Sequence, residues 1–211
     1  MTVETSEIAH LLAPFVELSP DQLRQVSTHL DLLLKWNSKV NLTSVRKPEE
    51  IVTRHFGESF FAARQLLSPK AADATVDVGS GAGFPGIPFA IFAPHARMAL
   101  IESNGKKAAF LNEAIFALKL SNANVFSGRA ENYSQNAADL VTMRAVEKFD
   151  NSLAVAIDLV RPGGRIGLMI GQAQVATTCD LAASLEWSEP IPLPGGHSRV
   201  VLAGTKPVTV E

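Results

Sequence analysis

Residues 75–88 read Thr75-Val76-Asp77-Val78-Gly79-Ser80-Gly81-Ala82-Gly83-Phe84-Pro85-Gly86-Ile87-Pro88, and this stretch decides the fold of the 211-residue chain. A short apolar run with one acid ends in four glycines within eight residues, and an apolar helical segment follows. Glycine lets the backbone turn where a Cβ atom would collide, and the next helix points free N–H groups into the space beyond the turn. This pattern predicts the crevice in which a doubly wound α/β sheet binds an adenosine-containing ligand, rather than a turn without a ligand.

The glycine spacing separates two ligand classes. Gly81-x-Gly83-x-x-Gly86 matches the dinucleotide pattern, so a nicotinamide or flavin enzyme has to be considered. The strand is expected to end at Val78, however, so that the turn begins one residue later and the relevant spacing is Gly79-x-Gly81-x-Gly83. This register argues against a dinucleotide.

The acid before the turn favours a different cofactor. Asp77 resembles the acid in the first motif of class I S-adenosylmethionine (SAM) methyltransferases. In that motif the glycine turn lies beside the methionine part of the cofactor, which carries an ammonium and a carboxylate group but no pyrophosphate. We therefore favour SAM.

Periodicity predicts two regions. Ser19 and Pro48 mark two helix starts, and from residue 75 onward strands and helices alternate. Strands are expected near 75–78, 97–101, 124–127, 139–143, 165–170 and 199–203, and helices near 86–93, 105–119, 148–160 and 174–185. The alternation predicts an α/β fold with a mainly parallel sheet and helices on both faces. Together with the resemblance of the Asp77 motif, this implies the Rossmann-like fold of class I SAM-dependent methyltransferases. We expect an N-terminal helical extension over residues 1–70 and the methyltransferase domain over 71–211.

Composition narrows the class of protein. No uninterrupted apolar run of about 18 residues exists, so no membrane span is predicted. The acidic start of the chain is unlike a secretory leader. The single cysteine, Cys179, excludes an internal disulfide and a cysteine-based metal cluster. We expect a cytoplasmic monomer without a metal.

Charge is unevenly distributed. The formal net charge is −2, which gives no overall attraction to nucleic acid. Residues 24–70, however, hold eight Lys and Arg against four acids. That segment is either a phosphate-binding face or an ordinary solvated helical surface, and charge alone does not separate the two.

Polar residues at later strand ends support the cofactor prediction. Glu102 closes the second strand, where an acid accepts hydrogen bonds from a ribose diol. Ala130 and Glu131 follow the third strand, and Arg144 ends the fourth. The cofactor contacts expected from the glycine loop and these strand ends are Asp77, Gly79, Gly81, Gly83 and Glu102.

Several motifs occur together in one order. They are Trp36-Asn37, Asn41-Leu42-Thr43-Ser44-Val45, Arg54-His55, the stretch from Asp77 to Pro88, Lys106-Lys107-x-x-Phe110-Leu111, Arg129-Ala130-Glu131 and Arg144-Ala145. From about Leu30 to Gly171 this set resembles the RsmG (GidB) family, bacterial methyltransferases that act on guanine N7 in 16S ribosomal RNA. The Phe-Pro-Gly-Ile-Pro extension of the glycine loop is the most specific element.

The resemblance implies a substrate and a site. It implies SAM bound by Gly79, Phe84, Ala130, Glu131 and Arg144, and a guanine in the 530 loop of 16S rRNA, free or within the small subunit, as methyl acceptor. The family usually has Asp-Ser after Arg-His, whereas this chain has Glu58-Ser59. The last forty residues match only loosely and are expected to carry no functional weight.

The expected chemistry needs no catalytic base. Guanine N7 has an in-plane lone pair and no proton, so positioning of the reacting atoms dominates. An exocyclic amine as acceptor would call for Asn or Asp and two prolines after the fourth strand, but the chain has Thr142-Met143-Arg144-Ala145. A pyrimidine carbon would need a cysteine at the site, and Cys179 lies in a late helical segment.

RNA contacts are expected from Arg54, His55, Lys106 and Lys107. His55 could instead pack within the helix, and the lysines could simply be solvated. Trp36 is expected to be a hydrophobic anchor between helices rather than a base-stacking residue. Two other functions stay open: a SAM-dependent enzyme for a small molecule and a non-catalytic ribosome-binding factor. The basic segment favours an RNA enzyme over a small-molecule enzyme. The intact glycine loop favours an RNA enzyme over a non-catalytic factor.

Overall fold

The computed structural model describes residues 3–67, 73–144, 149–195 and 198–208. Its strands are β1 Ala74–Val78, β2 Arg97–Glu102, β3 Ala123–Ser127, β4 Ala138–Arg144, β5 Val160–Gly171, β6 Glu186–Trp187, β7 Ile191–Pro192 and β8 Arg199–Thr205. Its α-helices are α1 Thr5–Leu12, α2 Pro20–Asn37, α3 Pro48–Ile51, α4 Glu58–Leu66, α5 Gly86–Phe92, α6 Gly105–Leu118, α7 Phe149–Leu159 and α8 Val175–Leu181. A π-helical turn, η1 Val52–Gly57, and two 3₁₀ turns, η2 Ala130–Asn132 and η3 Gln172–Gln174, complete the set.

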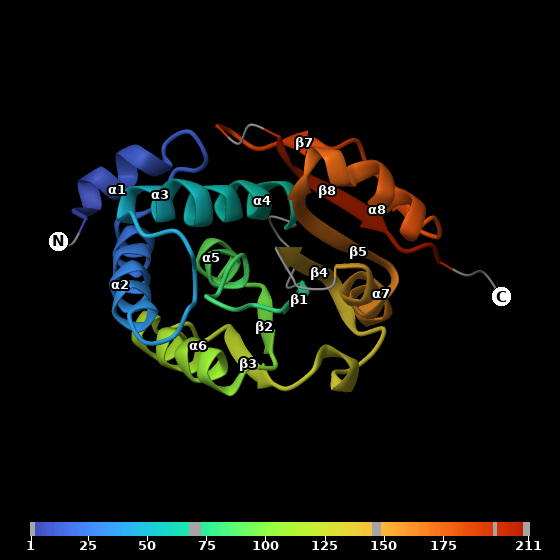
Figure 1. Ribbon diagram of the computed structural model, residues 1–211, viewed down its shortest axis with the longest axis horizontal. Helices are drawn as coiled ribbons and strands as arrows, with labels where there is room; N and C mark the ends of the chain where they lie inside the picture. The colour runs from blue at the N-terminus through green and yellow to red at the C-terminus, as the bar shows by residue number, and fades with distance from the viewer. Residues whose placement is uncertain (1–2, 68–72, 145–148, 196–197, 209–211) are drawn as a thin grey trace.

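The sheet is mainly parallel, as predicted. Its order is β3-β2-β1-β4-β5-β8-β6, with β7 pairing to β8. The first five strands run parallel and β8 runs antiparallel to β5. Figure 1 shows α2, α5 and α6 on one side of the sheet and α7 and α8 on the other. The strand order reverses direction at β1, so the carboxyl ends of β1 and β4 border the crevice where sheets of this kind bind ligands.

The two predicted helix starts are confirmed. Ser19 caps α2 with a capping box, because its Oγ accepts the Gln22 N–H and the Gln22 side chain accepts the Ser19 N–H. The helix that begins at Pro48 runs through α3, η1 and α4 as one rod across the top of Figure 1. The π turn in the middle of this rod was not predicted. Such turns occur often at functional sites.

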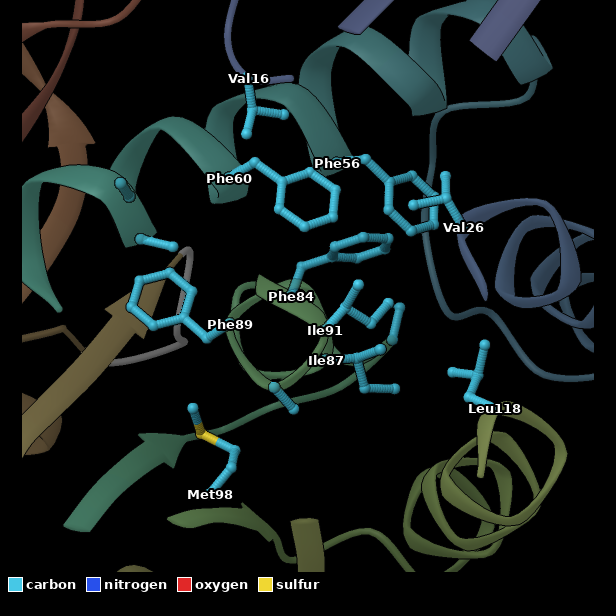
Figure 2. Close-up of a cluster of buried hydrophobic side chains, with 14 of the residues drawn as sticks. Val16, Val26, Phe56, Phe60, Phe84, Ile87, Phe89, Ile91, Met98 and Leu118 are labelled. Carbon is cyan, nitrogen blue, oxygen red and sulfur yellow. The ribbon is translucent and has the colours of Figure 1, made fainter. Parts of the chain in front are cut away.

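An aromatic layer joins the N-terminal helices to the sheet. Figure 2 shows Phe56 and Phe60 of the rod facing Phe84 and the helix α5. Phe56 and Phe84 meet edge to face, with ring centroids 4.9 Å apart. One buried cluster therefore contains residues from both sides of residue 70. The expected division into two domains stays a prediction.

Trp36 is the anchor that the sequence indicates. Its ring packs against Phe110 of α6 with centroids 5.8 Å apart, and its Nε1–H donates to Glu113. The contact ties the end of α2 to α6.

The strand β5 begins at Val160 instead of near 165, and the other large differences from the predicted elements lie near the two ends. The helix α1 and the short strands β6 and β7 were not predicted, and α8 ends at Leu181 instead of 185. Trp187 accounts for that early end, because its indole N–H donates to Ala182 O while its ring packs over Gly204 of β8. The predicted residue 148 at the start of α7 and the motif residue Ala145 lie outside the described residues. In the described parts of the chain, no helix combines the length and hydropathy needed to cross a bilayer.

Candidate functional site

The glycine loop closes the carboxyl end of β1. The N–H groups of Gly79 and Ser80 both donate to Ile101 O at 3.0 Å, which fixes the loop to the end of β2. The N–H groups of Gly83 and Phe84 then donate to Ser80 O at 2.7 and 3.2 Å. These bonds make a tight turn that leads directly into α5.

One face of this loop is open and the other is packed. Gly81 has φ +54°, and a Cβ added there would meet only Gly79 O, at 3.7 Å. A Cβ on Gly83 would lie 2.5 Å from Ile87 Cδ1, and one on Gly86 would lie 2.2 Å from Leu100 Cδ2. The loop is thus pressed against the core at Gly83 and Gly86, while Gly81 borders open space that a ligand can enter.

Asp77 supports the loop from within. Its side chain is fully buried, with Oδ2 accepting the Gly86 N–H at 3.2 Å and Oδ1 accepting the Thr142 hydroxyl at 2.9 Å. Burial raises the pKa of this carboxyl from 3.8 to about 6. We expected Asp77 to contact a cofactor directly. In the structure its oxygens instead join β4 and α5 beneath the glycine loop, so its place is that of a positioning residue.

Glu102 lies at the edge of the open face. Its Oε2 accepts the Gly81 N–H at 2.9 Å and its Oε1 accepts the Asn104 N–H at 2.8 Å. Each carboxylate oxygen has two acceptor sites, so both oxygens can still accept a ligand hydroxyl. The two amide bonds fix the carboxylate beside Gly81, where the sequence predicts a ribose.

The turn after β3 reaches the same edge. The Gly128 N–H donates to Glu102 O at 3.0 Å, which brings Ala130 and Glu131 of η2 toward the loop. Glu131 is exposed and pairs with Arg129 at 2.8 Å. The pairing and its hydrogen bond hold the pKa of the Glu131 carboxyl below its usual range.

Arg144 lies at the centre of a second cluster. Its Nη2 lies 2.8 Å from Arg54 O, 3.1 Å from Glu58 Oε2 and 3.2 Å from His55 Nδ1, while Nη1 donates to His55 O at 3.4 Å. Arg144 therefore joins the end of β4 to the π turn η1. Burial lowers the pKa of the guanidinium to about 10, and Glu58 opposes that shift.

His55 is held between two partners. The guanidinium group of Arg144 can only donate hydrogen bonds, so His55 Nδ1 accepts its bond. His55 Nε2 therefore carries the ring proton and donates it to Thr43 Oγ1 at 2.8 Å. Burial, and then the neighbouring arginines, lower the pKa of the imidazole to about 3, so the ring is neutral. We expected an RNA contact from His55. Both of its nitrogens are engaged within the protein instead, and its ring lies 5.1 Å from that of Phe84.

Glu58 and Arg199 belong to this cluster, and neither was predicted as a site residue. Glu58 is 3% exposed and its Oε1 lies 2.6 Å from Arg199 Nη2 on β8. The Glu58 carboxylate thus binds two arginines, and burial raises its pKa while both arginines oppose the rise. Glu58 occupies the position where the resembled family usually has Asp, and this difference is the feature of the sequence that could have indicated its place in the site. Arg199 comes from the last forty residues, which were expected to carry no functional weight, and nothing in its sequence context indicated this contact.

His29 is a further residue that the sequence did not single out. It lies on the buried stripe of α2, with its ring stacked on Phe84 at 5.2 Å and its Nε2 3.1 Å from Ala82 O. Burial lowers its pKa to about 4, so the neutral ring donates the Nε2 proton to that carbonyl. α2 is thereby bonded to the back of the glycine loop.

The remaining predicted RNA contacts are on the surface. Lys106 is exposed and Lys107 half-buried at the start of α6, where Asn104 Oδ1 accepts both backbone N–H groups. Arg54 points out of the rod and pairs with Glu50 at 3.3 Å. The structure brings Arg54 into the Arg144 cluster through its carbonyl, whereas the lysines follow Glu102 on the other side of the loop. Within the described ranges, no three His, Cys, Asp or Glu side chains are grouped to hold a metal ion.

Comparison with known sequences decides the family. A sequence model described as "GidB: rRNA small subunit methyltransferase G" matches residues 22–191. This chain belongs to the rRNA small subunit methyltransferase G family. Proteins named ribosomal RNA small subunit methyltransferase G from Xanthomonas euvesicatoria and Stenotrophomonas maltophilia are 45% and 39% identical to it. The alignments cover 68% and 83% of this chain, and 66% and 80% of those relatives, so just under two thirds of the first relative is spanned.

The rRNA small subunit methyltransferase G family match agrees with the fold. A crystal structure of a SAM-dependent O-methyltransferase from Thermotoga maritima superposes with a TM-score of 0.59 at 18% identity, covering 85% of this chain and 72% of that one. At that identity the likeness concerns the fold alone. The fold is that of class I SAM-dependent methyltransferases, as the glycine spacing predicted.

Proposed function

We propose that this protein transfers the methyl group of SAM to N7 of a guanine in the 530 loop of 16S rRNA, acting as a monomer in the bacterial cytoplasm. The observation that carries the proposal is the open face of Gly81 beside the Glu102 carboxylate, at the carboxyl end of β1. The family membership supplies the substrate class, because its curated members are named for a small-subunit rRNA.

The residues present fit SAM. The open face of Gly81 gives room for a ligand against the backbone, between Gly79 and Gly83 of the loop. The free acceptor sites of Glu102 suit a ribose diol, and Ala130 with Glu131 border the region beyond it, where an adenine would lie. Phe84 turns its ring inward onto His29 and Phe56, so we assign it to holding the loop. When bound, SAM supplies an electrophilic methyl group on its sulfonium.

The protein's task in this reaction is to align atoms. Guanine N7 attacks through a lone pair that carries no proton, so no side chain has to remove one. Holding the reactants in line contributes as much as roughly 7–11 kcal/mol of barrier reduction in favourable cases. Methylation makes the guanine cationic, and a bare arginine nearby would oppose that. Glu58 offsets the charge of Arg144, which leaves Arg144 able to orient ligands without strong repulsion.

RNA is proposed to approach from two sides of the loop. Arg54 lies on the side of the rod, and Lys106 and Lys107 lie at the start of α6. The three cations suit phosphate contacts, which position an RNA strand without reading its sequence.

The decisive experiment uses SAM labelled in its methyl group and small ribosomal subunits from cells that lack this modification. After incubation, strand cleavage at 7-methylguanine maps the product. Label at one guanine of the 530 loop is the expected result. Tight SAM binding without transfer to subunits or to free 16S rRNA would overturn the proposal.

A further inference from the structure

A hollow lies on the outer side of the rod. It has a volume of about 380 Å³ and opens between α1, η1 and the residues Pro194 and Gly195 that follow β7. Figure 1 shows α1 and β7 above the rod, at its two ends. The residues that line the hollow are His10, Leu11, Pro14, Phe15, Thr53, Arg54, Glu58, Pro194, Gly195 and Arg199.

One side of the hollow is cationic. Arg54 and Arg199 line it, and Arg144 lies directly behind the Glu58 carboxylate. Glu58 is the one acid among the described residues that line the hollow, and its two oxygens are already bound to Arg144 and Arg199. Counting Glu50, the surface partner of Arg54, three guanidinium groups face two carboxylates. One positive charge is left over, so the ligand that this balance favours is an anion of one charge, such as a phosphodiester group.

Another part of the lining is apolar. Leu11, Pro14 and Phe15 form this wall at the end of α1. Phe15 is held in place, because its ring packs against Gly57 and its carbonyl accepts a hydrogen bond from Arg64 at 2.8 Å. A flat, apolar ligand surface such as a nucleobase fits against this wall.

The hollow is adjacent to the proposed methyl-transfer site. Arg54 lines the hollow with its side chain, while its carbonyl oxygen accepts from Arg144 at the end of β4. Glu58 likewise faces the hollow and binds Arg144. A ligand in the hollow is therefore separated from the end of β4 by a single layer of side chains.

We infer that this hollow binds one nucleotide of the RNA strand next to the target guanine, with its phosphate on Arg54 and Arg199 and its base against Leu11, Pro14 and Phe15. The inference rests on the proposed function for the identity of the strand. The hollow itself is a mononucleotide site, and that property can be measured without methyl transfer.

The test is a titration of GMP into protein saturated with S-adenosylhomocysteine, which keeps GMP out of the cofactor crevice. Saturable binding is expected, at least tenfold weaker for guanosine, which lacks the phosphate, and for inorganic phosphate, which lacks the base. Arg54→Gln removes a cation and Leu11→Trp fills the hollow, and each should weaken GMP binding at least tenfold. Arg24→Gln removes another exposed arginine from an ion pair with a nearby acid, Asp21, and should change nothing.

The outcomes of this titration separate the nucleotide site from the proposed function. Absence of saturable GMP binding, or GMP affinity that neither Arg54→Gln nor Leu11→Trp alters, would overturn the inference. Arg54→Gln keeps the test valid if the tryptophan disturbs folding, because its side chain is on the surface. Methylation of rRNA with no GMP site would leave the proposed function intact and remove the hollow from it. GMP binding that the variants weaken as expected, without methylation of rRNA, would support the nucleotide site in the hollow and overturn the proposed function.

Discussion

The two halves of the site are built in different ways. The glycine half occupies ten consecutive residues, Asp77 to Gly86, and presents mainly backbone atoms to the open face. The arginine half joins side chains from four separate segments: Thr43, the rod with His55 and Glu58, Arg144 of β4, and Arg199 of β8. A short contiguous motif fixes the first half, whereas only the complete fold creates the second.

The difference has an energetic consequence. The backbone hydrogen bonds within the loop and to Ile101 O do not depend on a side chain, so the turn keeps its geometry as long as its glycines remain. A buried ion cluster depends on every partner, since removing one charge leaves another uncompensated away from water. We therefore expect the glycine half to lose ligand affinity when altered, and the arginine half to lose stability.

The largest effect is expected from Glu58→Ala. It leaves Arg144, which is 12% exposed on its side chain, without its anionic partner, and it frees Arg199 as well. Breaking such a buried pair costs about 3–5 kcal/mol of unfolding free energy, measurable by urea denaturation. Glu50→Ala removes the surface partner of Arg54 and should cost less than about 1 kcal/mol. Equal losses of unfolding free energy in the two variants would show that the buried cluster depends no more on its partners than a surface ion pair does.

Gly81→Asp should be the strongest change in the glycine half. Its side chain would project into open space without a clash, while φ +54° adds backbone strain that costs some stability. SAM affinity should fall at least 100-fold, or about 2.7 kcal/mol. Gly195→Asp is the matched control, because Gly195 has φ +64° and open space around its Cβ position but lies at the hollow. Calorimetry with SAM should find unchanged affinity for that control. Retained SAM binding in Gly81→Asp would mean that the loop faces another ligand.

A pH effect should come from His29, which joins α2 to the glycine loop. Its pKa is about 4 in the folded protein, against an ordinary value of 6.5, so the unfolded chain binds the extra proton as pH falls below 6.5. Stability is therefore complete above that pH, and His29 should account for a loss of about 2 kcal/mol between pH 7.5 and pH 5. His55 acts in the same direction, and Asp77, with its raised pKa, acts in the opposite one.

His29→Phe isolates the contribution of His29 to this pH dependence. The phenyl ring keeps the stacking position against Phe84 but cannot be protonated. Urea unfolding at both pH values should show a smaller pH dependence in the variant than in the parent protein. An unchanged difference would show that His29 is not the group responsible.

The smallest effects are expected on RNA affinity. Arg54→Glu and Lys106→Glu each remove one surface cation, the first on the rod and the second at the start of α6, and should weaken RNA binding roughly tenfold, or about 1.4 kcal/mol. SAM affinity should not change, and Arg24→Glu serves as the control at a distant site on α2. Filter binding at two salt concentrations measures the RNA affinity and its dependence on salt. If one of these two variants loses SAM affinity along with RNA affinity, the substituted residue has a structural role.

Sequence reasoning succeeded where the relevant contacts are local. The parallel sheet, the capping box at Ser19 and the glycine turn each follow from neighbouring residues, and the structure contains all three. The place of Asp77 beneath the loop could not be deduced, because its partner Thr142 is 65 residues away. The contact between Glu58 and Arg199 joins residues even further apart, and a lone arginine in a strand carries no signal of its own.

The position of β8 bears on the order in which the parts of the protein are made. This strand is synthesised after β5, β6 and β7, yet it is inserted between β5 and β6 in the finished sheet. Arg199 is therefore the last residue of the arginine half to be synthesised, long after the glycine turn. A partly synthesised chain that ends before β8 would contain the whole glycine turn but would lack the guanidinium that binds Glu58 Oε1.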